Sequence, residues 1–133
     1  MVEVTVHMEA EINPTEGEEK VREAINNVLG NASITITPIG KENTLTAEAS
    51  GRESLIKLRN ILRSDKVRDA SRKALFRSLQ GKTISFCLNK QVASAGHVSF
   101  SEETTESPLG PIRVTITSND PVQLIEWLAE KTR

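Results

Sequence analysis

Positively charged side chains are concentrated in one part of this chain, between Arg52 and Lys90. This segment holds eleven of the seventeen Lys and Arg residues and only three acidic residues, which gives it a formal charge of +8. Residues 1–51 carry −6 and residues 91–133 carry −3, so the net charge of −1 conceals a strongly divided molecule. A separate block of cations favours an anionic partner, and nucleic acids offer the most phosphate for each contact.

The spacing of these cations predicts that they line two helices. Apolar residues of the block recur at helical spacing on either side of Ser64, which indicates a helix before it and another after it. The cations of each helix fall at i, i+7 and i+11: Arg52, Arg59 and Arg63 in the first, and Lys66, Lys73 and Arg77 in the second. Arg68 and Arg72 add a pair one turn apart. Each helix is expected to present a cationic stripe beside its apolar face.

Three polar side chains follow a predicted strand and form the sharpest local candidate for a binding site. Asn89, Lys90 and Gln91 are succeeded by the small-residue stretch 93–96, which would let a ligand backbone come close. Asn and Gln read base edges in nucleic acids, and Lys contacts phosphate. The alternative is a strand-to-turn connection in which these side chains bond to nearby backbone groups. Both interpretations stay open at this point.

Other chemistry finds little support in the residues. His7 and His97 stand far apart in sequence with no Cys or carboxylate at ligand spacing, so we expect no metal site. Cys87 would need a nearby base to act as a nucleophile, and a sequence alone does not show which residues the fold brings beside it. Phosphate-binding loops, dinucleotide fingerprints and hydrolase motifs are absent from the sequence. We therefore expect neither an enzyme nor a bound cofactor.

The first third of the chain predicts three strands and a helix. Apolar and polar residues alternate from Val2 to Ile12, which is typical of a strand with one solvated face. Thr15 and Glu18 have the spacing of a capping box and predict the start of a helix that Gly30 ends. Alternating segments around residues 34–36 and 45–49 flank a turn-like stretch and indicate a hairpin.

The last part of the chain predicts three strands and a closing helix. Gly81 is expected to end the second basic helix. Strands are indicated around residues 84–88, 98–100 and 112–116 by their alternating apolar residues. Asp120 as the N-cap and Pro121 in the first turn predict the final helix.

This order of elements indicates one α+β domain spanning residues 1–133. We expect two layers, a largely antiparallel sheet with helices covering one of its faces. The other face, which would carry Thr5, His7 and Glu9, is expected to be solvated or to pair with another chain. A homodimer is compatible with this arrangement but not required by it.

Composition also bears on the surroundings of the protein. The single cysteine cannot form an intramolecular disulfide, and no signal-like segment opens the sequence, so we expect a cytoplasmic protein. The apolar runs are too short to span a membrane. Aromatic residues make up only 3% of the chain, which weighs against a site built on stacked bases. Contact with nucleic acid is therefore expected to be mainly electrostatic.

Four segments resemble an uncharacterised archaeal protein family, UPF0201. They are residues 8–16, 86–93, 107–112 and 120–128, and the resemblance covers nearly the whole chain. It implies an archaeal protein with a fold like that of the ribosomal protein that binds 5S ribosomal RNA, together with a homodimeric state. The family is often labelled RNA-binding by analogy of fold, which supplies no catalytic residue to transfer.

These observations predict an RNA-binding or ribonucleoprotein-associated protein without catalytic activity, whose partner is structured RNA. The candidate contact residues are Arg59, Arg63, Lys66, Arg68, Arg72, Lys73, Arg77, Lys82, Asn89, Lys90 and Gln91. The cations are expected to meet phosphates, and Asn89 and Gln91 are candidate readers of base edges. The alternative from a different class is a homodimeric protein-interaction scaffold. Both depend on folding that gathers the cations on one surface.

Overall fold

The protein is built on one antiparallel sheet. The computed structural model describes residues 3–12, 17–39, 42–101 and 111–130. The strands follow the order β2-β3-β1-β7-β5-β4. Strand β6 lies on the same side of β5 as β4 and pairs with the end of β5 that β4 does not reach. They are β1 (Val4–Ile12), β2 (Ser33–Ile39), β3 (Glu42–Ser50), β4 (Leu79–Gln80), β5 (Thr83–Asn89), β6 (Phe100–Ser101) and β7 (Pro111–Ser118).

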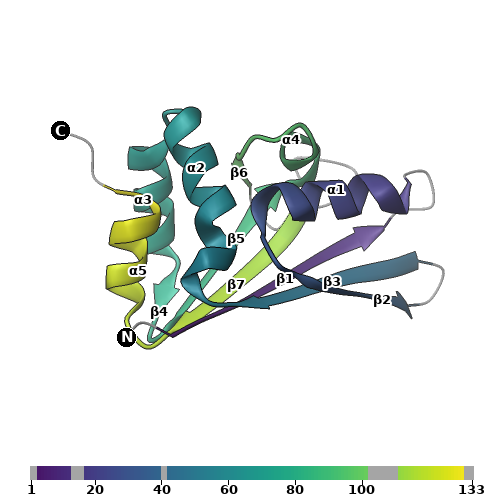
Figure 1. Ribbon diagram of the computed structural model, residues 1–133, viewed down its shortest axis with the longest axis horizontal. Helices are drawn as coiled ribbons and strands as arrows, with labels where there is room; N and C mark the ends of the chain where they lie inside the picture. Colours follow the sequence, from purple (N-terminus) through teal and green to yellow (C-terminus); the bar gives the residue numbers. More distant parts are fainter. Residues whose placement is uncertain (1–2, 13–16, 40–41, 102–110, 131–133) are drawn as a thin grey trace.

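Helices cover one face of this sheet, as Figure 1 shows. They are α1 (Glu18–Val28), the 3-10 helix η1 (Arg52–Leu55), α2 (Ile56–Ser64), α3 (Arg68–Arg77), α4 (Lys90–Ser94) and α5 (Pro121–Leu128). Helix α1 packs on β1 and β3, α3 on β5 and α5 on β7. The expected two-layer α+β fold is confirmed, and every described strand pair is antiparallel.

Alternation along β1 decides which face meets the helices. The buried residues of this strand are Val4, Val6, Met8, Ala10 and Ile12. Residues between them point to the other face, where His7 pairs with Glu48 of β3 and Thr115 of β7 in the sheet register. Because adjacent strands repeat the alternation in register, one face is apolar and the other is rich in Thr and Ser.

The predicted hairpin is confirmed, whereas the predicted start of α1 is wrong. Strands β2 and β3 pair from Ser33 opposite Glu48 to Ile39 opposite Glu42, and the residues between them lie outside the described chain. Helix α1 begins at Glu18 with Gly17 as its N-cap. Glu18 is thus the first helical residue and not the third, as a capping box would require. Thr15 lies outside the described residues.

The basic segment ends differently from the prediction. Helix α3 stops at Arg77, and Leu79 and Gln80 form the short strand β4. Gly81, with a φ of 62°, lies in the connection from β4 to β5 and is not a helix cap. Beyond β5 the chain forms the short helix α4 where a turn was expected. The predicted N-cap at Asp120 is confirmed, since its side chain accepts a hydrogen bond from the Gln123 N–H at 3.1 Å.

A continuous apolar core lies between the two layers. It includes Met8 of β1, Ile25 of α1, Leu62 of α2, Leu75 of α3 and Ile125 of α5, each at most 1% exposed. Every major helix therefore contributes to the same buried cluster, which holds the helices in place over the sheet. No helix in the described ranges is long and apolar enough to cross a membrane.

Candidate nucleic-acid interface

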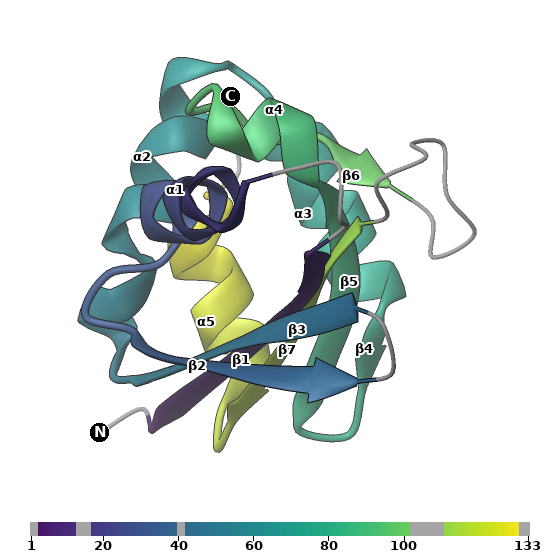
Figure 2. The ribbon, with the colours of Figure 1, turned by 90° about the vertical axis from the view of Figure 1, so that its right-hand side faces the viewer.

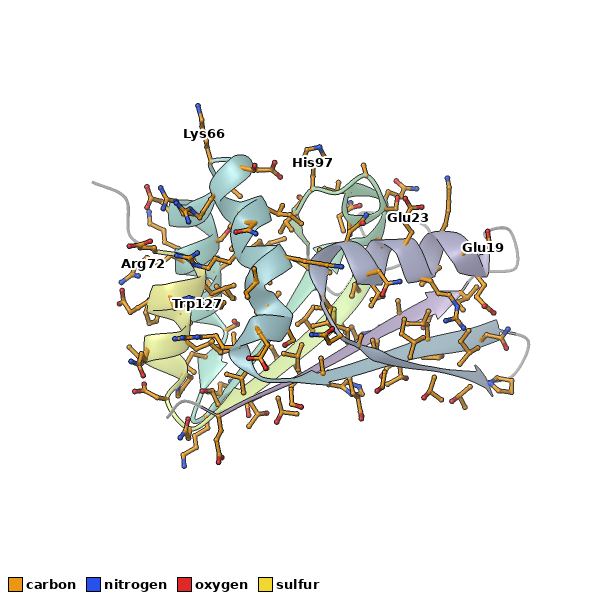
Figure 3. All side chains as sticks on the ribbon, in the orientation of Figure 1. Glu19, Glu23, Lys66, Arg72, His97 and Trp127 are labelled. Atoms are coloured by element: carbon orange, nitrogen blue, oxygen red, sulfur yellow. The ribbon has the colours of Figure 1, made fainter. Side chains whose placement is uncertain are left out.

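The basic segment folds into η1, α2, the turn after α2, α3, β4, β5 and the first residue of α4. Its two longer helices both lie against α5, the closing helix of the chain. Figure 3 shows Lys66 projecting from the end of α2, while Arg72 and Trp127 lie at the side of the molecule occupied by α5. Some of the cations therefore meet α5, and others face solvent.

The arginines of the first stripe are held by Trp127. The guanidinium carbons of Arg52 and Arg59 lie 5.0 and 5.3 Å from the centroid of the indole ring. Arg59 Nε also donates to the Trp127 carbonyl at 3.0 Å, and its guanidinium lies 3.8 Å from Glu130. Contact with an aromatic face stabilises a guanidinium and orders it. Of the predicted stripe, only Arg63 is left without such a contact among the described residues.

Arg72 is also held by α5. Its guanidinium donates two hydrogen bonds to the carboxylate of Glu126, one of them 2.7 Å long, and lies 5.0 Å from the Phe76 ring centroid. The hydrogen bonds with Glu126 raise the pKa of Arg72 above its ordinary value, and the charges of Glu126 and Asp69 act in the same direction against partial desolvation. Two parallel bonds are the geometry in which arginine binds carboxylates best. Arg72 is therefore a structural link from α3 to α5.

Apart from Lys57, which donates to the Asn26 carbonyl at 2.8 Å, and Lys90, the remaining cations of the segment have no ion pair or hydrogen bond from their side chains to any described residue. They are Arg63, Lys66, Arg68, Lys73, Arg77 and Lys82. All are exposed except Arg68, which is half-buried. Lys73 and Arg77 are one turn apart on the outer side of α3, opposite the buried Ser71 and Leu75. These six residues are called the α3 cation group below.

The turn that carries Lys66 closes α2 in a Schellman arrangement. The N–H of Lys66 bonds to the Arg63 carbonyl at 3.3 Å, and the N–H of Val67 bonds to the Leu62 carbonyl at 3.2 Å. The φ of Lys66 is 58°, the left-handed conformation that this motif normally assigns to glycine. A lysine is less stable in this conformation than a glycine would be.

Next to this turn, Asp65 is bonded to a residue from a distant segment. His97 Nδ1 lies 2.9 Å from Asp65 Oδ1, and this contact joins the loop after α4 to the end of α2. One of the few carboxylates of the basic segment is thus directed toward His97 and not toward the α3 cation group. Sequence reasoning missed this pair, because nothing in the spacing of the two residues indicates it.

The three polar residues where β5 ends and α4 begins have different environments. Asn89 is the N-cap of α4 and accepts a hydrogen bond from the Val92 N–H at 3.0 Å. Lys90 is only 2% exposed, and its Nζ donates to the Glu11 carbonyl at 2.6 Å. Gln91 is exposed. For Asn89 the interpretation in which the side chain bonds to a nearby backbone group is confirmed. For Lys90 the expected phosphate contact is corrected, because its ammonium group is enclosed by the fold.

Trp127 is the main residue of this region that sequence reasoning did not assign to the site. Its helical position beside Leu124 and Leu128 marked it as part of a closing helix, whereas its two arginine partners come from a segment about seventy residues earlier. Among the described residues no three His, Cys, Asp or Glu side chains come together in a group that could hold a metal ion. The contacts described for this region are those between arginine side chains and α5.

Comparison with known proteins gives matches along the chain. A family model described as RNA binding matches residues 5–118. A UPF0201 protein of Sulfolobus acidocaldarius is 45% identical over 127 residues, which cover 96% of this chain and 88% of that protein. A UPF0201 protein of Aeropyrum pernix is 39% identical, with coverage of 97% and 87%. Identity at this level over almost the full length places these proteins in one family.

Solved structures agree with the sequence relatives. The crystal structure of a UPF0201 protein from Methanococcus jannaschii is 28% identical, covers 97% of this chain and 95% of its own, and superposes with a TM-score of 0.86. A more distant protein from Methanothermobacter thermautotrophicus, described as a DUF54 protein, has 19% identity and a TM-score of 0.66, which indicates the shared fold alone. With the family model, the relatives and the fold in agreement, the chain belongs to the archaeal UPF0201 family.

Proposed function

We propose that this protein binds structured RNA through contacts between phosphates and the α3 cation group. The observation that carries the proposal is that six cations of one segment lack carboxylate partners in the described chain. Three neighbouring arginines of the same segment are bound to α5. The family description of RNA binding supports the same partner. Phosphate offers the α3 cation group the anions that the protein itself does not.

The conformation of Lys66 supports this surface as the place of contact. Glycine would close α2 with less strain, so the lysine costs stability where it stands. Strain of this kind is often found where a side chain serves binding. Lys66 projects from the end of α2, where a long phosphate backbone would reach it without rearrangement of the fold.

The candidate set is therefore narrower than the one that sequence predicts. Arg59 and Arg72 are assigned to the contact of α2 and α3 with α5. Asn89 is assigned to capping α4, and Lys90 to the core. Gln91 stays a candidate reader of base edges because it is exposed.

The direct test is the salt dependence of binding to a structured RNA, measured by filter retention. With six phosphate contacts, the plot of log affinity against log salt should have a slope of about −5. The double charge reversal Lys73→Glu/Arg77→Glu should weaken binding, and it should reduce the magnitude of the slope by about two. The unfolding transition should stay where it is, since neither side chain has a bonded partner among the described residues.

A matched control is available on α1. Lys20→Glu/Arg22→Glu changes the net charge by the same amount on a helix that also carries Glu18, Glu19 and Glu23. Because Arg22 is bonded to Glu18, far-UV circular dichroism checks that this variant stays folded. This variant should retain most of the RNA affinity if the position of the charge matters. Equal losses in the two variants, or a slope near zero in the wild type, would refute the proposal.

The alternative function is a homodimeric interaction scaffold, and one observation favours a role for self-association. Strand β2 is an edge strand whose outer side pairs with no described segment. Dimerisation and RNA binding would use different parts of the molecule, because α3 packs on β5, which is separated from β2 by three strands of the sheet. A protein that is dimeric and fails to retain RNA would favour the scaffold.

A further inference from the structure

The two edges of the sheet are built differently. One edge of β5 is lined by β4 and β6, which are two residues long each. At the other edge stands β2, a strand of seven residues paired on one side with β3. Short strands protect an edge from pairing with another chain, whereas a long regular strand presents a row of free backbone groups. The structure thus protects one edge and leaves the other open, as the front strand β2 shows in Figure 2.

The side chains of β2 do nothing to discourage pairing. Its sequence alternates Ile with Ser or Thr from Ser33 to Thr37, and the whole strand to Ile39 contains no charged residue. Edge strands that must stay single usually carry Lys or other charges. Pro38 is the one residue of the strand that removes a donor, and it stands near the end.

Two observations identify which backbone groups of β2 point outward. The Gly51 N–H bonds to the Val4 carbonyl at 2.9 Å, so Val4 and every second residue after it direct their backbone groups toward β3. The residues of β3 that bond to β1 alternate with those that bond to β2. In the register of β2 and β3, Thr35 and its alternate neighbours therefore bond to β3, and the backbone groups of Ile34 and Ile36 point outward. Pro38 agrees, because its missing N–H then falls on the outer side.

This pattern is complementary to itself. If a second copy runs antiparallel with Thr35 opposite Thr35 on a two-fold axis, Ile34 of each copy falls opposite Ile36 of the other. Each of these two pairs then exchanges both its N–H and its C=O bonds, as a hydrogen-bonded antiparallel pair does. The same axis places apolar side chains together on the helix side of the sheet and hydroxyl side chains together on the open side.

Burial of the strand residues fits such a contact. Ile34 and Ile36 lie at the margin of the core and are only half-buried, since α1 packs mainly over β1 and β3. Ser33, Thr35 and Thr37 on the opposite face are exposed. A second copy would cover the remaining apolar surface of both isoleucines, which contributes to association in addition to the backbone hydrogen bonds.

We propose that β2 is the dimerisation strand of this protein and pairs with β2 of a second copy about a two-fold axis at Thr35. The result is one continuous antiparallel sheet across both copies. The partner is another copy and not a nucleic acid, because the strand offers no cation to phosphate. The proposal stands independently of RNA binding, since α3 and α5 pack over β5 and β7 at a distance from this edge.

Cysteine crosslinking tests both the contact and its register. In a Cys87→Ser background, Thr35→Cys should form an intermolecular disulfide on mild oxidation, because non-hydrogen-bonded antiparallel partners lie about 4.5 Å apart at Cα. Thr37→Cys is the matched control on the same face of the strand. Its partner in the other copy would be displaced by four residues, about 13 Å, which is beyond the reach of a disulfide. Equal crosslinking of the two variants would overturn the proposed register.

Sedimentation of the uncrosslinked protein supplies the second measurement. The wild type should sediment with the mass of a dimer and dissociate on dilution. Thr35→Arg should shift it to monomer by placing two like charges opposite each other, whereas Thr37→Arg should not. Both sites are exposed, so folding should be retained, and far-UV circular dichroism checks this. A wild type that is monomeric throughout the concentration series, or a dimer indifferent to Thr35→Arg, would overturn the proposal.

Discussion

The cations facing α5 and the cations facing solvent come from the same short segment, yet the fold uses them differently. Arg52, Arg59 and Arg72 are bound to the ring, carbonyl and carboxylate groups of α5. Lys73 and Arg77 extend from the outer side of α3 without such partners among the described residues. Counting charges along a chain therefore finds a basic segment but does not locate the surface that is available to a ligand.

The difference has an energetic side as well. A guanidinium held on an aromatic ring or in a bidentate pair stabilises the fold, whereas an exposed cation with like-charged neighbours contributes little or opposes it. Substitutions should thus separate the two groups by their effect on stability and on RNA binding. The predictions below begin with the largest expected effect.

Trp127→Ala should give the largest loss of stability. The ring packs against the core and lies beside both Arg52 and Arg59, so its removal takes away apolar burial together with two cation–π contacts. We expect a loss of about 3 kcal/mol in the free energy of unfolding, measured by urea denaturation. RNA affinity of the folded fraction should be unchanged. A strong loss of RNA affinity without a loss of stability would place Trp127 in the RNA interface, and the separation of the two groups of cations would then be wrong.

Lys90→Met tests whether this cation belongs to the core. The substitution keeps an unbranched side chain but removes the ammonium group that donates to the Glu11 carbonyl. Because that carbonyl loses the buried ammonium group as its hydrogen-bond partner, we expect a loss of about 2 kcal/mol in the free energy of unfolding. The slope of RNA affinity against salt should not change, since Lys90 is enclosed. A smaller slope would return Lys90 to the set of phosphate contacts.

Lys66→Gly should change stability and binding in opposite directions. Glycine adopts a φ of 58° without strain, so we expect the free energy of unfolding to rise by about 1 kcal/mol. RNA binding should weaken because one phosphate contact is lost. Lys66→Ala separates the two causes, since it removes the charge and keeps the strain. If Lys66→Gly binds RNA as tightly as the wild type, Lys66 does not belong to the interface.

Asn89→Ala should have the smallest effect, a loss of about 1 kcal/mol or less from the missing cap of a short helix. Asn89→Ser is the conservative control, because a serine side chain caps in the same way. Thermal unfolding ranks the three proteins, and RNA retention should be equal in all of them. Weaker retention by both variants would show that the Asn89 amide contacts the ligand.

Much of the fold could be predicted from the sequence because it depends on local patterns. The alternation from Val4 to Ile12 indicates β1 and its buried face, and Asp120 followed by Pro121 marks the start of α5. Strand β4 could not be found in this way. Two residues directly after a helix carry no periodicity, and their pairing with β5 depends on the connection that Gly81 permits.

The candidate site could be predicted only in part, because partners distant in sequence decide which cations are free. The spacing of Arg59 and Arg63 gives their shared side of α2, but only folding brings Trp127 and Glu130 to Arg59. The burial of Lys90 depends in the same way on Glu11, from the other end of the chain. The dimer and the likeness to the ribosomal protein stay predictions.

The short strands β4 and β6, at the edge of the sheet opposite β2, would limit how many copies can join. Two copies joined through β2 would expose at each extremity only strands two residues long. Neither offers enough consecutive backbone groups to recruit a third copy, so growth by strand addition stops once the two-fold pair has closed. A dimer joined in this way would therefore use β2 for pairing without polymerising into fibres.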